Sequence, residues 1–255
     1  MNSRFLAVLV ILLPAMATGA SAQSEAQRDA FLAGTSSDCP GCDLKGAVLT
    51  YRDLSNANLE GADLSGARLH RAILAGANLK GATLSGANLN LADLRKADLS
   101  SASLTGSLLY EANLTTANLA GASFEKAKIQ HAKFGASNLS SAKFGGADAT
   151  EASFMGANMQ GADLSDVYAP AADLRQARLQ GADLSESTFF QATFVGADLS
   201  GATARNSDFR QSRLNRAKFT GADLSASKFA QAWIEKADFE NVVVTGTTGL
   251  TLPKQ

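Results

Sequence analysis

Cys39 and Cys42 are the first residues whose types and spacing could support chemistry. They form a Cys-x-x-Cys motif and are the two cysteines of the chain. Such a pair can form a structural disulfide, or it can exchange disulfides with other proteins when one thiolate is activated. The strand-helix-strand pattern of thioredoxin-like proteins does not surround the motif. We expect a structural disulfide or paired thiols, and a disulfide-handling protein is the alternative.

The chain has few residues suited to metal binding or acid–base catalysis. Structural zinc is almost always held by four ligands, and two Cys and two His are all that the chain contains, so a zinc site would need every one of them. We therefore expect no metal site. His70 and His131 have no Ser or Cys nucleophile beside them in the sequence, and we expect both at solvated corners. The sequence identifies no catalytic residue and no cofactor, which predicts a protein that is not an enzyme.

The charge balance restricts the partners further. Lys and Arg number 23, against 24 Asp and Glu. A balanced chain lacks the basic surplus that attracts nucleic acid, and it lacks the acidic surplus of a protein that mimics nucleic acid. We therefore expect no nucleic-acid partner.

The first residues have the three parts of a secretory signal peptide. Arg4 precedes an apolar run, 5–13, that is too short to cross a bilayer as a helix. Ala20-Ser21-Ala22 offers a small-x-small cleavage site, so we expect cleavage near Ala22 and export to the periplasm or the cell exterior. No Cys follows the run as a lipid anchor, and no transmembrane anchor is expected. A buried core segment is the alternative interpretation.

The elements that could position these residues follow from a five-residue repeat. From Leu44 to Phe239, every fifth position belongs to one register of 40 positions, of which 37 are Leu, Ile, Phe or Met. Two residues before each of these central residues lies a second register, which is Ala or Ser at 37 of 40 positions. Three extended residues place both registers on one face. The other two must turn the chain, so each unit forms a short side and a corner, with both registers inward.

A slower rhythm of four units gives the number of sides. Five Asn lie directly before central residues, and seven Gly lie two residues after them. Within each set the positions differ by 20 residues or a multiple of 20. These residues are Asn58, Asn78, Asn118, Asn138 and Asn158, and Gly61, Gly81, Gly121, Gly161, Gly181, Gly201 and Gly221. A coil of four units has four sides and aligns like residues in ladders, and Gly suits a corner with a positive φ. Asp63 and Asp163 are expected to hydrogen-bond their local backbone.

The repeating units resemble those of a known family. Gly61-Ala62-Asp63-Leu64-Ser65 and Gly221-Ala222-Asp223-Leu224-Ser225 match the A-[DN]-L-x-x signature of pentapeptide-repeat proteins, over roughly residues 42–241. The resemblance implies an all-β fold, a right-handed quadrilateral β-helix of about ten coils, roughly 48 Å long at the usual strand spacing. Some members resemble B-form DNA and inhibit DNA gyrase. Those members are cytoplasmic and acidic, and this chain departs from them in both respects.

Both ends of such a rod need a cover, because open strand edges invite association. We divide the chain into a signal peptide (1–22), an N-terminal cap segment (23–41), the β-helix (42–241) and a C-terminal tail or cap (242–255). Residues 24–32 are predicted to form a short helix with Ser24 as its N-cap. The apolar tail would close the other end, and a homodimer through an end cap is one expected form of association.

Outward apolar residues are the candidates for a partner surface. Folding the sequence at four units per coil places one group, together with Val48, on a single side: Leu91, Leu108, Tyr110, Tyr168 and Phe190. A second side carries Ile73, Met155, Val195 and Trp233. The segment 167–170 departs from the repeat, which predicts a bulge on the first side. Scattered exposure without a function is the alternative.

The leading hypothesis is an exported, non-enzymatic scaffold that binds an unknown protein or surface polymer through a flat side of the rod. The alternatives are a gyrase-interacting DNA mimic and a disulfide-handling protein that uses Cys39 and Cys42. An ice- or mineral-binding rod would need a regular Thr ladder on one side, and the sequence lacks that ladder.

Overall fold

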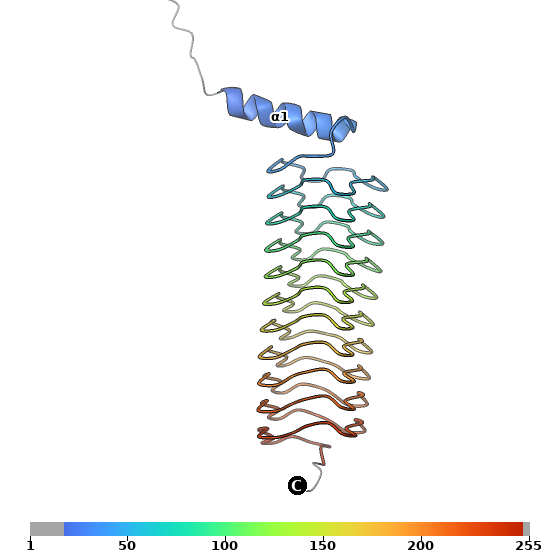
Figure 1. Cartoon of the computed structure of the whole chain (residues 1–255), viewed down its shortest axis with the longest axis vertical. Coiled ribbons are helices and arrows are strands. Elements are labelled where there is room, and N and C mark those ends of the chain that lie inside the picture. The colour runs from blue at the N-terminus through green and yellow to red at the C-terminus, as the bar shows by residue number, and fades with distance from the viewer. Residues whose placement is uncertain (1–17, 252–255) are drawn as a thin grey trace, which may run out of the picture.

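The molecule is a rod of stacked four-sided coils with a helix at one end (Figure 1). The structure is a computed structural model that describes residues 18–251. Parallel β-bridges join each side to the same side of the next coil, from Asp43 with Asp63 to Lys228 with Thr248. Each side contributes a single bridge residue, so no longer strand forms within 18–251. Each bridge joins a residue to the equivalent residue four units later in the chain. This confirms the predicted coil of four units.

The two inward registers fill the rod. Every residue of both registers between Ala57 and Phe229 is buried, which confirms that both point inward. From Phe124 onward aromatic rings thicken this core, and they stack from one coil to the next. Phe144, for example, lies parallel to Phe124 with ring centroids 4.9 Å apart, and Phe219 stacks in the same way on Phe239 at 5.1 Å.

The predicted bulge at 167–170 is wrong. Tyr168 keeps its bridges to Asp148 and Thr188, so the chain stays in register through this segment. Val167 is large for the small register, but the central residue Ala169 beside it is small, and both are buried. The pair conserves the packed volume, which is the kind of exchange that a core tolerates best.

In the unit 62–66 every backbone N–H group has a hydrogen-bond partner. The first N–H closes the preceding turn on Leu59 at 3.1 Å, and the second, third and fifth bond to adjacent coils at 2.9, 2.7 and 2.9 Å. The fourth N–H, that of Ser65, donates to Oδ1 of Asp63 at 3.0 Å. Because nearly every buried backbone N–H needs a partner, this arrangement explains why Asp or Asn recurs before the central residue.

The corners all share one backbone feature. The second turn residue has a positive φ at every corner from Gly41 to Gly246, and most of these residues are not glycine. At most corners the residue after the corner also donates its N–H to the carbonyl of the central residue before it, which defines a type II turn. At Val167 and Ser207 this N–H instead bonds to the hydroxyl of Ser187 or Ser227 on the next coil. The sequence predicts positive φ only at a repeated Gly corner, whereas the stacked coils also impose it on residues as large as Tyr51 and Leu91.

The N-terminal end is covered by helix α1, which spans Thr18–Ala33 and lies across the first coil in Figure 1. The prediction that the helix begins at Ser24 is wrong, because the helix already starts at Thr18. Near its C-terminus Phe31 is fully buried against the core. Gly34 then ends the helix with a φ of 80° and an N–H donated to the Phe31 carbonyl at 3.0 Å. Residues 18–22 of the predicted signal peptide lie in α1. Residues 1–17 of that peptide lie outside the described range.

Arg52 occupies a position of the small inward register, and its contacts with α1 explain this departure. Its guanidinium donates hydrogen bonds to the carbonyl oxygens of Phe31 and Leu32, and it lies 4.5 Å from the centroid of the Phe31 ring. Positive charge at a helix C-terminus is favourable, because the last carbonyl groups carry partial negative charge. Arg52 thus holds α1 on the first coil.

The C-terminal end of the rod is less closed. The coil geometry continues past Asn241, since Val243 and Thr248 still form bridges with the coil before them. Val242 and Leu250 pack against the core, but both remain partly exposed. Among residues 18–251, the last coil therefore has fewer covering neighbours than the first coil beneath α1.

Candidate functional site

Cys39 and Cys42 are joined by a disulfide bond in the turn that leads into the first coil. Both residues are buried in the core beneath α1. Thiol–disulfide exchange requires a partner thiolate to reach one sulfur atom, so burial opposes a role in disulfide handling. The pair closes the top of the rod, next to the residues that hold the helix.

The Asp residues serve their own turns. Oδ1 of Asp163 accepts the backbone N–H of Ser165 at 3.0 Å. Asp183 and Asp223 likewise each accept the backbone N–H of the residue two positions after them. The prediction that these side chains bond to the local backbone is confirmed. The bond from the Ser225 hydroxyl at 2.6 Å lowers the pKa of Asp223 below its ordinary value, because it favours the charged form. Metal ligation is not needed to explain these residues, and within 18–251 no three His, Cys, Asp or Glu cluster in a way that could hold a metal ion.

The five residues predicted as a partner surface lie on one side of the rod. We call this the tyrosine side: the outward residues beside Leu49 and beside its equivalent on each later coil, to Phe229. Tyr110 and Tyr168 are exposed by 43% and 53%. The other three residues, Leu91, Leu108 and Phe190, are half-buried and therefore less accessible. The two tyrosines thus form most of the apolar surface that a partner would contact here.

The tyrosine side holds more aromatic residues than we predict from the sequence. Tyr51, which is 63% exposed, and the two histidines His70 and His131 lie on the same side. All three tyrosines and both histidines of the chain are therefore gathered on one of four sides. The signal was present in the sequence, because the same folding at four units per coil assigns these further residues to this side.

The rings on this side contact one another across neighbouring coils. Tyr51 and His70 meet edge to face with centroids 5.9 Å apart, and Tyr110 and His131 do so at 5.2 Å. Edge-to-face packing suits the charge distribution of aromatic rings. Within the second pair, a hydrogen bond with the Glu111 carboxylate raises the pKa of Tyr110 above its ordinary value. The Tyr110 phenol therefore keeps its proton to a higher pH than an ordinary tyrosine does.

A shallow hollow on the tyrosine side lies near its C-terminal end. It is lined by Tyr168, Pro170, Thr188, Phe190, Asp208 and Arg210. The Arg210 guanidinium binds both carboxylate oxygens of Asp208, with its shortest contact at 2.6 Å, and lies 5.9 Å from the Phe190 centroid. The ion pair fixes the Arg210 side chain, so the hollow keeps an aromatic wall beside a polar one.

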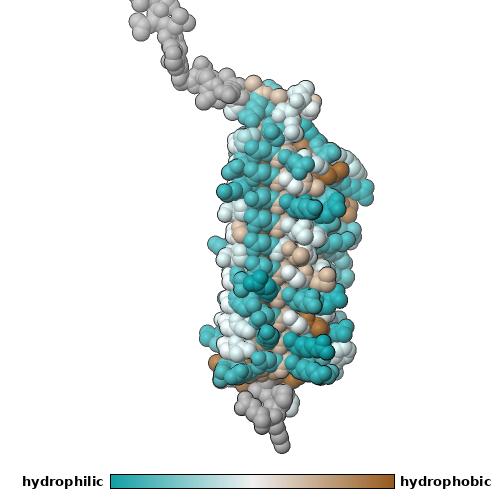
Figure 2. All heavy atoms as spheres, in the orientation of Figure 1, coloured by the Kyte–Doolittle hydropathy of each residue, from teal (hydrophilic) through white to brown (hydrophobic). Residues whose placement is uncertain are grey.

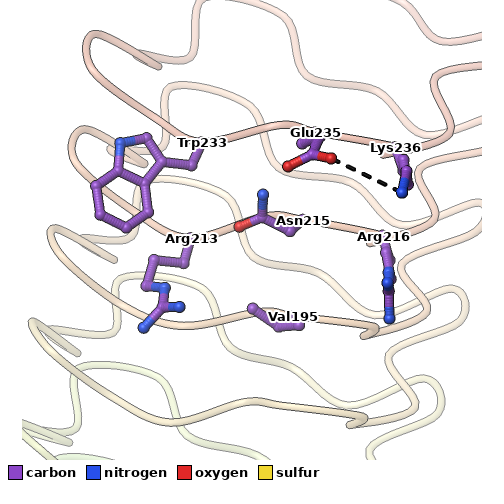
Figure 3. A pocket seen from close by; sticks show the side chains of 7 residues that line it. All are labelled: Val195, Arg213, Asn215, Arg216, Trp233, Glu235 and Lys236. Atoms are coloured by element: carbon purple, nitrogen blue, oxygen red, sulfur yellow. Dashed lines mark ion pairs between the residues drawn. The ribbon is translucent and has the colours of Figure 1, made fainter.

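A second hollow lies on the adjacent side, around Trp233 (Figure 3). Its lining residues are Val195, Arg213, Asn215, Arg216, Trp233, Glu235 and Lys236. The guanidinium of Arg213 lies 5.4 Å from the indole centroid, and Nζ of Lys236 lies 3.8 Å from Oε1 of Glu235. At the corner between the two sides, Gln191, Gln211 and Gln231 form a ladder with amide hydrogen bonds of 2.9 Å.

The chain belongs to the pentapeptide repeat family. The family model matches eight times, at residues 35–66, 42–81, 53–90, 72–109, 97–135, 132–168, 171–203 and 205–241. As in that family, the chain folds as a right-handed quadrilateral β-helix, and the resemblance recognised in the sequence is confirmed. Proteins of this family are in general non-enzymatic structural or interaction proteins.

Solved structures of the family resemble the rod. HetL, a pentapeptide repeat protein involved in heterocyst differentiation regulation from the cyanobacterium Nostoc, is 28% identical, with a TM-score of 0.49 over 85% of this chain and 93% of HetL. A trypsin-treated form of QnrB1, a plasmid-mediated fluoroquinolone resistance protein, is 18% identical, with a TM-score of 0.50 over 78% of this chain and 88% of QnrB1. The likeness to QnrB1 shows a common fold alone.

Curated proteins of known function provide no significant match to this sequence. Within residues 18–251, no helix has both the length and the apolar character needed to span a membrane.

Proposed function

We propose that the chain is an exported, non-enzymatic interaction scaffold whose tyrosine side binds a protein or a surface polymer. The observation that carries this proposal is the gathering of all three tyrosines and both histidines on one side. Outward side chains add little to the stability of the stacked coils, because the core and the backbone bonds hold the rod. Aromatic residues are also the side chains most enriched at binding surfaces.

Export is supported by the N-terminal sequence and by the disulfide. Residues 1–22 have the three-part pattern of a signal peptide. The disulfide of Cys39 and Cys42 fits an exported chain, because such bonds persist in oxidising compartments. Cleavage near Ala22 would leave residues 23–33 of α1, which include the buried Phe31, in place on the first coil.

A binding role also agrees with the way in which the polar residues are used. The recurring Asp and Asn residues are engaged with backbone N–H groups, and Arg210 is engaged with Asp208. Nδ1 of His131 lies 3.4 Å from Oε2 of Glu151, at a corner where His131 is half-buried and Glu151 is exposed. These contacts hold the polar side chains in place, which suits the surface of an interaction scaffold.

The test compares two variants of the processed protein that change different sides. Tyr51→Ala, Tyr110→Ala and Tyr168→Ala together remove the exposed rings of the tyrosine side. The matched control, Ile73→Ala with Met155→Ala, removes apolar residues of 40% and 46% exposure from the adjacent side. Each protein is incubated with envelope fragments from the producing cell, and the sedimented fraction is measured. Mass spectrometry of the exported protein determines its first residue.

We expect the unchanged protein and the control to sediment with the fragments, and we expect at least tenfold weaker binding by the tyrosine variant. Equal binding by all three proteins would contradict a binding role for the tyrosine side. A protein that keeps residues 1–22 and stays in the cytoplasm would contradict export. Unchanged thermal unfolding of both variants would show that lost binding does not result from lost folding.

A further inference from the structure

The aromatic residues of the tyrosine side form three pairs at equal spacing. The first pair is Tyr51 with His70 and the second is Tyr110 with His131, both in ring contact. Tyr168 and Phe190 form the third pair in the walls of one hollow. The three tyrosines lie on the first, fourth and seventh coils of this side, so successive pairs are three coils apart. With coils one strand spacing apart, the pairs recur about every 14 Å along the rod.

Each pair is accompanied by an aliphatic residue on the same coil as its tyrosine. These neighbours are Val48 beside Tyr51, Leu108 beside Tyr110 and Pro170 beside Tyr168. Between the pairs the outward residues are polar apart from Leu91. Asn88 and Asn90 lie on the coil of Leu91 after the first pair, and Asp148 and Thr150 follow the second pair. The surface thus consists of three separate aromatic platforms. On the face shown in Figure 2, the most strongly apolar side chains lie singly among polar ones.

The charge of the tyrosine side is nearly neutral. Its outward residues include five basic and four acidic side chains, namely Arg68, Arg71, Lys128, Arg210 and Lys228, and Glu111, Asp148, Glu151 and Asp208. Several of these charges are occupied locally, since Arg71 lies 5.8 Å from the Tyr51 centroid and Arg210 pairs with Asp208. A polyanion would gain little from such a mixture, so the complementary partner is uncharged.

We propose that the tyrosine side binds a linear neutral polysaccharide that lies along the rod and contacts all three aromatic pairs. A sugar ring presents C–H groups on its faces, and these are attracted to the negative π face of an aromatic ring. Its hydroxyl groups can exchange hydrogen bonds with the Tyr110 phenol and with amides such as Asn88, which donate and accept. This inference rests on the proposed function and names the chemical class of the partner.

The spacing of the platforms favours a polymer over a folded protein. A protein interface has a contiguous apolar core surrounded by a polar rim, whereas these platforms lie about 14 Å apart with polar residues between them. A linear polymer can bridge such a gap, and every further platform that it reaches binds in an intramolecular step. Three weak contacts in one line can therefore give much tighter binding than a single contact.

Affinity electrophoresis tests the inference with defined polymers. The folded, processed protein is run through native gels that contain hydroxyethyl cellulose or glucomannan, which are neutral, or carboxymethyl cellulose, which carries negative charge. The variants remove one pair (Tyr110→Ala with His131→Ala), two pairs (adding Tyr51→Ala and His70→Ala) or all three (adding Tyr168→Ala and Phe190→Ala). Ile73→Ala with Met155→Ala is the control, and thermal unfolding of every variant reports its folding.

We expect a neutral polymer to retard the unchanged protein and the control equally. Each lost pair should weaken the apparent affinity about tenfold or more, through the loss of one linked contact. Retardation by neither neutral polymer, retardation only by carboxymethyl cellulose, or equal retardation of all variants would overturn the inference. Binding to envelope fragments that depends on the tyrosines but disappears after protease treatment of the fragments would also overturn it, while leaving the proposed function intact.

Discussion

Arg52 donates a hydrogen bond to the carbonyl oxygen of Phe31, and its guanidinium lies over the ring of the same residue. One side chain therefore caps the C-terminus of α1 and holds the buried aromatic residue that closes the first coil. This contact joins two parts of the chain that the sequence presents separately, the helix and the first repeat.

Replacing Arg52 with alanine should loosen the helix without unfolding the rod. A hydrogen bond from a charged group contributes about 1.5–3 kcal/mol, and the contact with the ring adds to it. We expect amide hydrogen exchange in residues 24–33 to become at least tenfold faster, while exchange in the middle coils stays the same. Arg68→Ala, at an exposed position, is the control. Unchanged exchange in α1 would show that Arg52 does not hold the helix.

Phe144→Ala should remove a central part of the core. The ring stacks on Phe124 and meets Phe134 and Phe154 edge to face. Truncation of a buried Phe costs about 3–5 kcal/mol, and a leucine at the same position should cost less because it fills part of the cavity. Denaturant unfolding measures both changes. Because each coil contacts only its neighbours, the loss of exchange protection should be centred on the adjacent coils, and uniform loss along the rod would contradict this view.

Ser187→Ala should be more costly than Ser137→Ala, although both serines are buried. The Ser187 hydroxyl lies between two groups of the preceding coil, since it donates to the Leu164 carbonyl and accepts the Val167 N–H at 3.0 Å. The Ser137 hydroxyl donates at 2.8 Å to the Phe134 carbonyl, which already accepts the Ser137 N–H. Unpaired buried groups cost about 1–3 kcal/mol each. Equal unfolding midpoints for the two variants would contradict this difference.

The rod should lose stability in acid. Hydrogen bonds from the Ser55 hydroxyl and backbone lower the pKa of Asp53, and the guanidinium of Arg95 lowers the pKa of Asp93. A lowered pKa in the folded state means that the carboxylate stabilises the protein above the pKa of the unfolded chain, about 3.9. This stabilisation disappears as the pH falls through the lower, folded-state value.

We therefore expect the melting temperature to fall between about pH 5 and pH 2. Asp53→Asn with Asp223→Asn should make this fall smaller, because the amide oxygen can still accept the backbone N–H but carries no charge to lose. A steeper fall in the double variant would contradict this assignment.

The sequence was sufficient to predict the repeating part of the fold. Period five is incompatible with one face of either a helix or a continuous strand, and the ladders at every fourth unit leave four sides as the consistent solution. The inward direction of Leu64 and Ala62 follows from the same argument. The tyrosine side could be predicted in part, because Tyr110 and Tyr168 fall on one side when the sequence is folded at this period.

Other features depend on contacts that no local pattern encodes. Ser24 is a good N-cap residue, but the preceding residues also form helix, so the helix continues past it to Thr18. Val167 suggests a bulge until Ala169 is seen to compensate for its volume. Tyr51 adopts a positive φ because the stacked corners impose it. Arg52 interrupts the small register because it reaches α1, which lies outside the repeat.

Photo-crosslinking in the producing cell tests the central claim, that the tyrosine side is the binding surface, most directly. A benzophenone amino acid is placed at Tyr110, or at Ala120, which lies half a coil away on the opposite side. We predict a crosslinked product of the exported protein from position 110 and none from position 120. Equal products from both positions, or a product from position 120 alone, would contradict the account.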